Sequence, residues 1–112
     1  MTTLYKATRT ERATVVQEAR VVLGPERDEV PKGSYREVQV LVPVGNGLFM
    51  GVDMPVQGEF EEGGIGPNRT YKMPKMPTGQ AIVFRLQPQQ SITAMAESGT
   101  VHLALIIEHI QD

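Results

Sequence analysis

Histidine is the side chain whose ordinary pKa lies nearest to neutral pH, so it is the first candidate for proton transfer or metal binding. The chain contains two histidines, His102 and His109, and both fall in its last apolar segment. If that segment is a strand, residues seven positions apart point to opposite faces and cannot hold one metal ion. Glu108 shares a face with His102, but the strand between them separates the two by about 20 Å. We therefore expect each histidine to be a packing or surface residue.

An acidic cluster and a glycine run are the next candidates. Oxygen ligands for calcium could come from Asp53, Glu59, Glu61 and Glu62. Their spacing does not match a helix–loop–helix calcium site, so we interpret them as solvated loop charges. The glycine-rich residues 63–66 lack the Lys-Ser/Thr pair of a phosphate-binding loop.

Nucleophilic residues are also poorly placed for catalysis. Ser34, Ser91 and Ser98 lie beside predicted turns, without a neighbouring histidine to activate them. The chain has no cysteine, which excludes disulfides and thiolate zinc sites. The sequence therefore predicts a protein that is not an enzyme and has no catalytic residue, metal ligand or cofactor.

Length and charge restrict the class of protein further. A chain of 112 residues is expected to form one domain. Its net charge of −2 argues against nucleic-acid binding, which usually requires a basic excess. The longest apolar run, residues 103–107, is too short to span a bilayer, and we see no signal-peptide pattern. We expect no membrane association and a cytoplasmic origin.

Alternation of apolar and polar residues predicts a series of short strands. The clearest strand places Val38, Val40, Val42 and Val44 on one face. Gly45-Asn46-Gly47 separates it from a second run that ends at Met54, and the two runs predict a β-hairpin. Further strands are expected at residues 82–86, 92–96 and 101–107. Six or seven such strands predict a mostly β fold, a single antiparallel β-sandwich or jelly roll.

The N-terminal residues have no apolar period and carry a basic excess. We predict an extended N-terminal arm over residues 1–12, followed by a β-sandwich domain over residues 13–112. Residues 1–36 have a net charge of +2 against −4 for the remainder, so the arm is expected to dock on an acidic protein surface. The arm residues proposed for this contact are Tyr5, Lys6, Arg9 and Arg12. Deleting the arm should then leave the fold intact.

Two segments leave alternatives open. Residues 13–23 are rich in valine and favour a strand, although Thr10 could cap a helix that closes at Gly24-Pro25. The last strand is apolar on both faces, with Ile106 and Ile110 on the second one. It therefore lies centrally in the sandwich, or its second face meets another subunit.

Residues 28–110 resemble, in pattern, the small β-sandwich structural proteins of tailed bacteriophages. Such proteins have a Val-Pro-x-Gly turn before an aliphatic strand, as in Val30-Pro31-Lys32-Gly33 here. They also close with a Leu-x-Pro segment, a Ser-Gly turn and a final strand, which match Leu86-Gln87-Pro88, Ser98-Gly99 and residues 101–107. Gln89 stands where glycine is usual.

This resemblance implies a virion structural protein, a capsid decoration protein that is assembled in the host cytoplasm and becomes part of the virion. The implied partners are other copies of the chain, as a homotrimer, and the major capsid protein or another virion protein. The protein-binding residues would be the four arm residues together with Ile106 and Ile110.

Two alternatives belong to other classes of function. A carbohydrate- or receptor-binding module would present exposed aromatic residues, for which the candidates are Tyr5, Tyr35, Tyr71, Phe49 and Phe60. A cupin-like enzyme would need several histidines on inward strand positions, and two histidines on opposite faces do not supply them.

Overall fold

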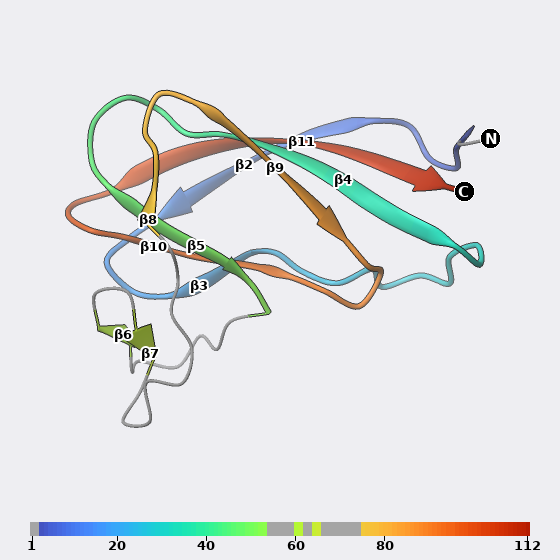
Figure 1. Cartoon of the computed structure of the whole chain (residues 1–112), viewed down its shortest axis with the longest axis horizontal. Helices are drawn as coiled ribbons and strands as arrows, with labels where there is room; N and C mark the ends of the chain where they lie inside the picture. Colours follow the sequence, from blue (N-terminus) through green and yellow to red (C-terminus); the bar gives the residue numbers. More distant parts are fainter. Residues whose placement is uncertain (1–2, 54–59, 62–63, 66–74) are drawn as a thin grey trace.

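The computed structural model describes residues 3–53, 60–61, 64–65 and 75–112. These residues form strands, turns and loops without a helix, and Figure 1 shows two layers of antiparallel strands packed together. The predicted mostly β sandwich is confirmed. Within the described residues, no helix is long and apolar enough to cross a membrane.

The larger sheet, sheet A, is built around the last strand of the chain. One side of β11 (Val101–Gln111) pairs with β4 (Ser34–Leu41), which pairs in turn with β9 (Ala81–Leu86). The other side pairs with β2 (Arg9–Val15) and, near its C-terminal end, with β1 (Thr3–Leu4). Since β11 has neighbours on both sides, it occupies the central position that its two apolar faces allowed.

The smaller sheet, sheet B, forms the second layer. Its strands follow the order β3-β10-β5-β8. These strands are β3 (Arg20–Leu23), β10 (Ile92–Ala96), β5 (Leu48–Val52) and β8 (Lys75–Met76). A separate pair of short strands consists of β6 (Phe60–Glu61) and β7 (Gly64–Ile65).

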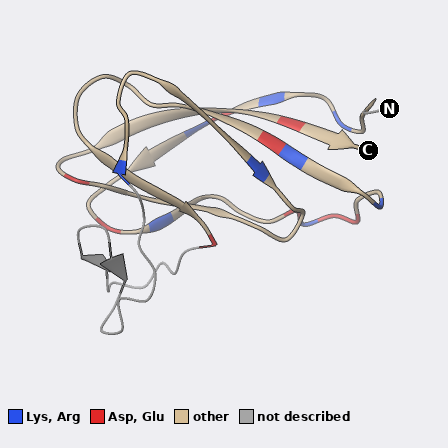
Figure 2. Ribbon diagram, viewed as in Figure 1, with Lys and Arg blue, Asp and Glu red and all other residues tan. Residues whose placement is uncertain are grey.

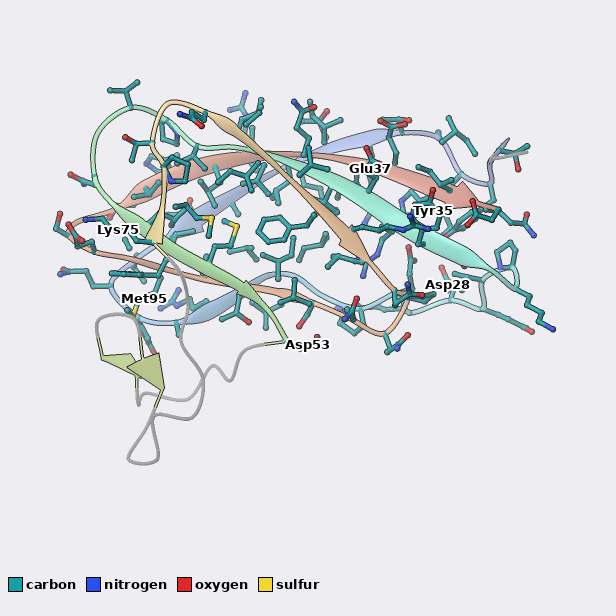
Figure 3. The ribbon with its side chains drawn as sticks, viewed as in Figure 1. Asp28, Tyr35, Glu37, Asp53, Lys75 and Met95 are labelled. Atoms are coloured by element: carbon teal, nitrogen blue, oxygen red, sulfur yellow. The ribbon has the colours of Figure 1, made fainter. Side chains whose placement is uncertain are left out.

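The core lies between the two sheets and is aliphatic. Alternate residues of β4 and β11 point inward, so Val38, Val40, Leu105 and Ile107 are fully buried. β10 and β5 meet them from the opposite layer through Ile92, Leu48 and other apolar side chains. Figure 3 shows that side chains from both layers fill the space between the two sheets.

The hairpin predicted from residues 38–54 is wrong. β4 belongs to sheet A and β5 to sheet B, and the connection between them crosses from one layer to the other. Each strand has a continuous apolar face, and such a face can pack against the core from either sheet, so the pattern did not distinguish the two arrangements. The connection is held on the β9 side, because the Val42 N–H donates to the Gln80 carbonyl at 3.0 Å.

Residues 13–23 are extended rather than helical, but they contribute to two strands instead of one. β2 ends at Val15 in sheet A, and β3 begins at Arg20 in sheet B. The Ala96 N–H donates to the Val16 carbonyl at 2.8 Å, which holds the crossing to the end of β10.

The extended N-terminal arm is not confirmed. Within residues 3–12, Thr3 and Leu4 pair with β11 as β1, and residues 9–12 pair with it as part of β2. The Tyr5 N–H donates to the His109 carbonyl at 3.1 Å, which adds a further backbone hydrogen bond between the N-terminal segment and β11. These residues form one edge of sheet A.

Deletion of residues 1–12 should therefore destabilise the protein. The deletion removes β1 and more than half of β2, and it leaves one side of the central strand uncovered. We expect the loss of a large fraction of the roughly 5–15 kcal/mol that stabilises a typical domain. Urea unfolding followed by circular dichroism measures this loss. An unchanged unfolding midpoint would restore the view that these residues are a free arm.

Candidate functional site

The six residues predicted to bind proteins fall into two groups in the structure. Tyr5, Lys6 and Arg9 contact other residues of their own chain near one end of the sandwich. Arg12, Ile106 and Ile110 belong to the outward side of sheet A, as their register shows below. The first group forms part of an internal polar cluster, and the second belongs to a candidate binding surface.

The polar cluster is centred on Glu26, whose side chain is 8 % exposed. Its Oε1 lies 2.9 Å from His109 Nδ1 and 3.5 Å from Arg36 Nε. The Arg36 guanidinium donates two further hydrogen bonds of 2.8 Å, one to the Gly24 carbonyl and one to the Gln90 carbonyl. Arg36 therefore ties the segment after β3 to the turn before β10.

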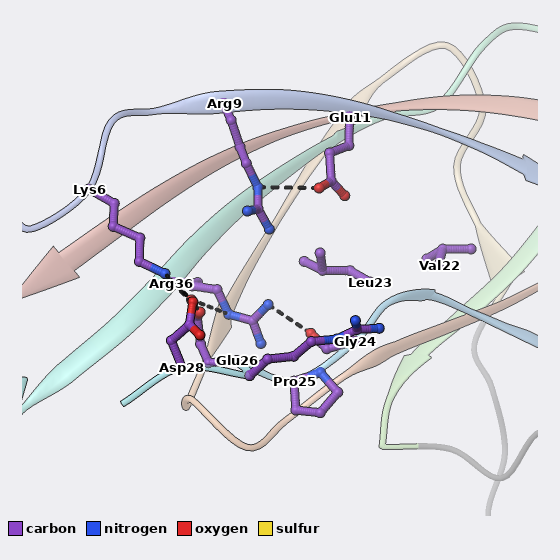
Figure 4. A pocket seen from close by; sticks show the side chains of 11 residues that line it. Lys6, Arg9, Glu11, Val22, Leu23, Gly24, Pro25, Glu26, Asp28 and Arg36 are labelled. Carbon is purple, nitrogen blue, oxygen red and sulfur yellow. Dashed lines mark hydrogen bonds and ion pairs between the residues drawn. The ribbon is translucent and has the colours of Figure 1, made fainter. Parts of the chain in front are cut away.

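The N-terminal segment completes this cluster. Lys6 Nζ lies 3.5 Å from Glu26 Oε2 and 4.0 Å from Asp28 Oδ2 (Figure 4). The Tyr5 hydroxyl donates to Glu26 Oε1 at 3.5 Å, and the Tyr5 ring meets the His109 ring edge-on at a centroid distance of 5.6 Å. The contacts expected to reach a neighbouring subunit are thus made, in part, within the chain.

Burial sets the charge states in this cluster. Burial lowers the pKa of His109, and it also lowers the pKa of Arg36. Burial alone would raise the pKa of Glu26. The positive charges around it, which are His109 when protonated, Lys6 and Arg36, have the larger combined effect, so the pKa of Glu26 is lowered. Neither ring nitrogen of His109 has an aligned hydrogen-bond partner within the described residues. A neutral His109 beside an ionised Glu26 follows.

A polar cavity of about 320 Å³ opens next to this cluster (Figure 4). Lys6, Arg9, Glu11 and Arg36 contribute charged groups to its wall. Arg9 Nε lies 3.3 Å from Glu11 Oε1, and Lys6 and Arg36 are occupied by Glu26. Arg27, Glu26 and Asp28 also line the cavity, so four cations and three carboxylates are mixed in its wall, and the arrangement offers no single-signed site for a ligand.

The sequence contained a partial signal for this cluster. Arg36 is in phase with Val38 and Val40, and His109 is in phase with Leu105 and Ile107, so the alternation places both on the core face. Glu26 lies in a charged connection without a period, and no pattern marks it as buried. The His–carboxylate pair that the sequence did not predict is therefore His109–Glu26.

Sheet A presents a second, outward surface that we call the outer face. Residues opposite one another in the ladder share a face, which gives rows across β11, β4 and β9. One row joins Leu4, Ile110 and Tyr35. The next row joins Glu108, Glu37 and Arg85. It is followed by a row of Thr10, Ile106, Gln39 and Val83, and then by a row of Arg12, Ala104, Leu41 and Ala81.

Apolar side chains are unusually exposed on the outer face. Val83 is 59 % exposed, Leu4 54 % and Leu41 39 %, while Ile106 and Ile110 are half-buried. A shallow hollow of about 380 Å³ lies beside Leu41 and is lined also by Arg12, Pro43, His102 and Ala104. Large exposed apolar patches of this kind mark interaction surfaces on soluble proteins.

A row of charged residues crosses the outer face between Ile106 and Ile110. Glu37 and Glu108 lie opposite one another, and Arg85 lies next to Glu37 on β9. The Arg85 guanidinium also stacks 3.8 Å above the Tyr35 ring, which covers that ring. In Figure 2 the charged segments of β4, β9 and the C-terminal half of β11 gather at this end.

Two of the other chemical candidates, Asp53 and Ser91, contact each other. The Ser91 N–H donates to Asp53 Oδ1 at 2.8 Å, so this carboxylate fastens the end of β5 to the start of β10. Glu59, Glu62, Gly63 and Gly66 lie outside the described residues. Among residues 3–53, 60–61, 64–65 and 75–112, no group of three or more His, Asp or Glu side chains could hold a metal ion.

The two histidines face opposite sides, as predicted. His102 is exposed on the outer side, where its Nδ1 lies 3.4 Å from the Thr14 hydroxyl, and His109 is buried. The chain matches no protein-family model, no curated protein and no solved structure.

Replacement of the buried arginine should be costly. Arg36→Met leaves Glu26 without its buried cation and two carbonyl groups without their donor, so we expect a loss of about 3–5 kcal/mol in unfolding free energy. Arg20→Met is the matched control, because Arg20 pairs with Glu18 at an exposed site and should cost about 0–1 kcal/mol. Urea unfolding measures both variants. Equal losses in the two would contradict the role assigned to Arg36.

The stability of the protein should fall on mild acidification. The folded pKa of His109 lies below the ordinary 6.5, so the unfolded chain binds the proton more readily. The stabilising effect of a neutral His109 is complete above pH 6.5 and decreases as the pH falls, by up to about 1.4 kcal/mol per pH unit. The lowered pKa of Glu26 adds a further loss below its ordinary 4.5.

The measurement is the unfolding free energy at intervals between pH 7.5 and 5.0. His109→Gln should flatten the curve in this range, although the variant is less stable throughout. His102→Gln removes the exposed histidine and should keep the wild-type slope. A His109→Gln curve that retains that slope would assign the titration to another group.

Proposed function

We propose that the protein is a virion structural protein that decorates a capsid shell and binds it through the outer face of sheet A. The observation that carries this proposal is the exposed apolar patch of Leu41, Val83 and Ile106 on that face, with Leu4 and Ile110 as a second apolar area beyond the charged row. No other described strand covers it. A rigid sheet with such a patch is suited to protein binding.

The composition of the face supports a protein partner. The patch of Leu41, Val83 and Ile106 is flanked by Arg12 and by the row of Glu108, Glu37 and Arg85, so charged side chains adjoin an apolar area as they do in protein interfaces. The pattern of turns and strands that resembles tailed-phage structural proteins gives the class of partner, which is the major capsid protein or another virion protein.

The carbohydrate-binding alternative receives less support. Phe49 and Tyr35 are buried, and Tyr5 is directed to Glu26 and His109. The remaining named candidates are Tyr71, which lies outside the described residues, and Phe60, whose side chain is not described. The described aromatic residues therefore offer no stacking platform for a sugar.

Substitution on the outer face should weaken binding to the shell. Leu41→Lys places a charge in the apolar patch, and we expect the affinity to fall by about tenfold or more. Val21→Lys is the matched control, because Val21 on β3 in sheet B is similarly exposed, at 47 % against 39 % for Leu41. Both variants should keep the circular dichroism spectrum of the wild type.

The assay is co-sedimentation with purified capsid shells of the virus that encodes the chain, prepared without this protein. Wild-type protein that stays in the supernatant would overturn the proposal. Equal binding by the Leu41→Lys variant and the wild type would show that another face is used. Capsid or portal genes beside the gene of this chain would support the same class of function.

A further inference from the structure

β9 leaves one edge of sheet A open. Among the described strands it pairs with β4 alone, so half of its backbone N–H and C=O groups point away from the sheet. Residues 81–86 contain no proline and one charge, Arg85. The opposite edge differs, because β2 carries Arg9, Glu11 and Arg12, and charged side chains on an edge discourage pairing with another strand.

Side chains along this edge are incompletely buried. Ile82 and Phe84 point toward the core, where they lie opposite Val40 and Val38 in the ladder. The two valines are 0 % exposed, whereas Ile82 and Phe84 are only partly buried. The difference arises because the sheet stops at β9. A further strand at this edge would cover both side chains.

We propose that β9 pairs antiparallel with β9 of a second copy of this chain, about a two-fold axis at Val83. In this register Ile82 lies opposite the partner subunit's Phe84, and Phe84 lies opposite the partner subunit's Ile82. Aromatic and β-branched residues form favourable cross-strand pairs. Val83 faces its own symmetry mate, and Arg85 faces the partner subunit's Ala81, so no like charges meet.

The β9 sequence is self-complementary, which identifies a second copy of the chain as the partner at this edge. A two-fold contact uses the same patch on both subunits, so its residues must suit one another across the axis. The sequence from Ala81 to Arg85 meets this condition, with an apolar residue on the axis and its one charge opposite alanine. A register centred on Phe84 would instead set Val83 against Arg85.

The pairing has a consequence for the assembly that the protein forms. It joins two copies of sheet A edge to edge and extends the outer face into one continuous surface. A two-fold contact gives a dimer, whereas the phage resemblance implied a homotrimer. The pairing does not depend on a capsid shell as the partner, so it can be tested on the protein alone.

A single cysteine tests the proposed axis. The chain has no cysteine of its own, and opposed residues of antiparallel strands lie within the Cα distance that a disulfide spans. Val83→Cys should therefore form a covalent dimer on mild oxidation. Leu41→Cys is the matched control, because Leu41 faces the same way on β4, about 20 Å from its symmetry mate across the axis, and should stay monomeric on a denaturing gel.

Charge substitution gives an independent test in solution. Wild-type protein should sediment at twice the monomer mass of 12.3 kDa. Val83→Lys and Val83→Glu each set like charges face to face and should sediment as monomers, and an equimolar mixture of the two should recover the dimer. Both variants alter an exposed side chain, so each should keep the wild-type circular dichroism spectrum.

A wild-type monomer or trimer at 100 μM would overturn the proposal, as would a dimer that Val83→Lys leaves intact. Crosslinking of Leu41→Cys in place of Val83→Cys would show that copies meet through their outer faces instead. Ile106→Lys distinguishes this proposal from shell binding. Ile106 lies on the central strand, so the variant should keep the dimer mass while its binding to shells falls.

Discussion

The burial of one carboxylate, Glu26, organises the end of the sandwich at which the polar cluster lies. Glu26 lies between the layers, where an unpaired charge would cost several kcal/mol. Two cations and a neutral histidine, from three parts of the chain, surround it. Lys6 comes from the N-terminal segment, Arg36 from β4 and His109 from β11. The bonds from Arg36 to the Gly24 and Gln90 carbonyls then hold two turns in place. Loss of Arg36 would leave the Glu26 carboxylate without its most buried cation.

The two sides of sheet A differ in which side chains they bury and which they expose. On the inner side, charge is buried at one end and an aliphatic core fills the rest. On the outer side, one charged row separates two apolar areas, and apolar side chains such as Val83 and Leu41 face solvent. The inner groups are therefore committed to stability, and the outer ones remain available for contacts with other molecules.

The alternation of apolar residues was sufficient to predict the sandwich and most of its central strands. β9, β10 and β11 lie where the period of two placed them, because each buries one face against the core. The predicted strand through Val44 is too long, because β4 ends at Leu41 and Val44 is 87 % exposed. Pairing was harder to predict, since the same pattern lets residues 48–52 join either layer. The edge position of β1 and β2 was missed because an edge strand needs few apolar residues. Glu26 was missed because its burial depends on tertiary partners far apart in the sequence.

The position of β11 constrains how the chain reaches its native state. The central strand of sheet A is the last to be synthesised, and β4 has β11 and β9 as its neighbours, both made later. At 5–20 residues per second, the ribosome needs about 3–12 s to pass from Leu41 to Val101. During that time the valine-rich β4 has no native partner on its β11 side. Folding of this sheet is therefore completed only after β11 has been synthesised, and fragments that stop before β11 would expose a strand prone to aggregation.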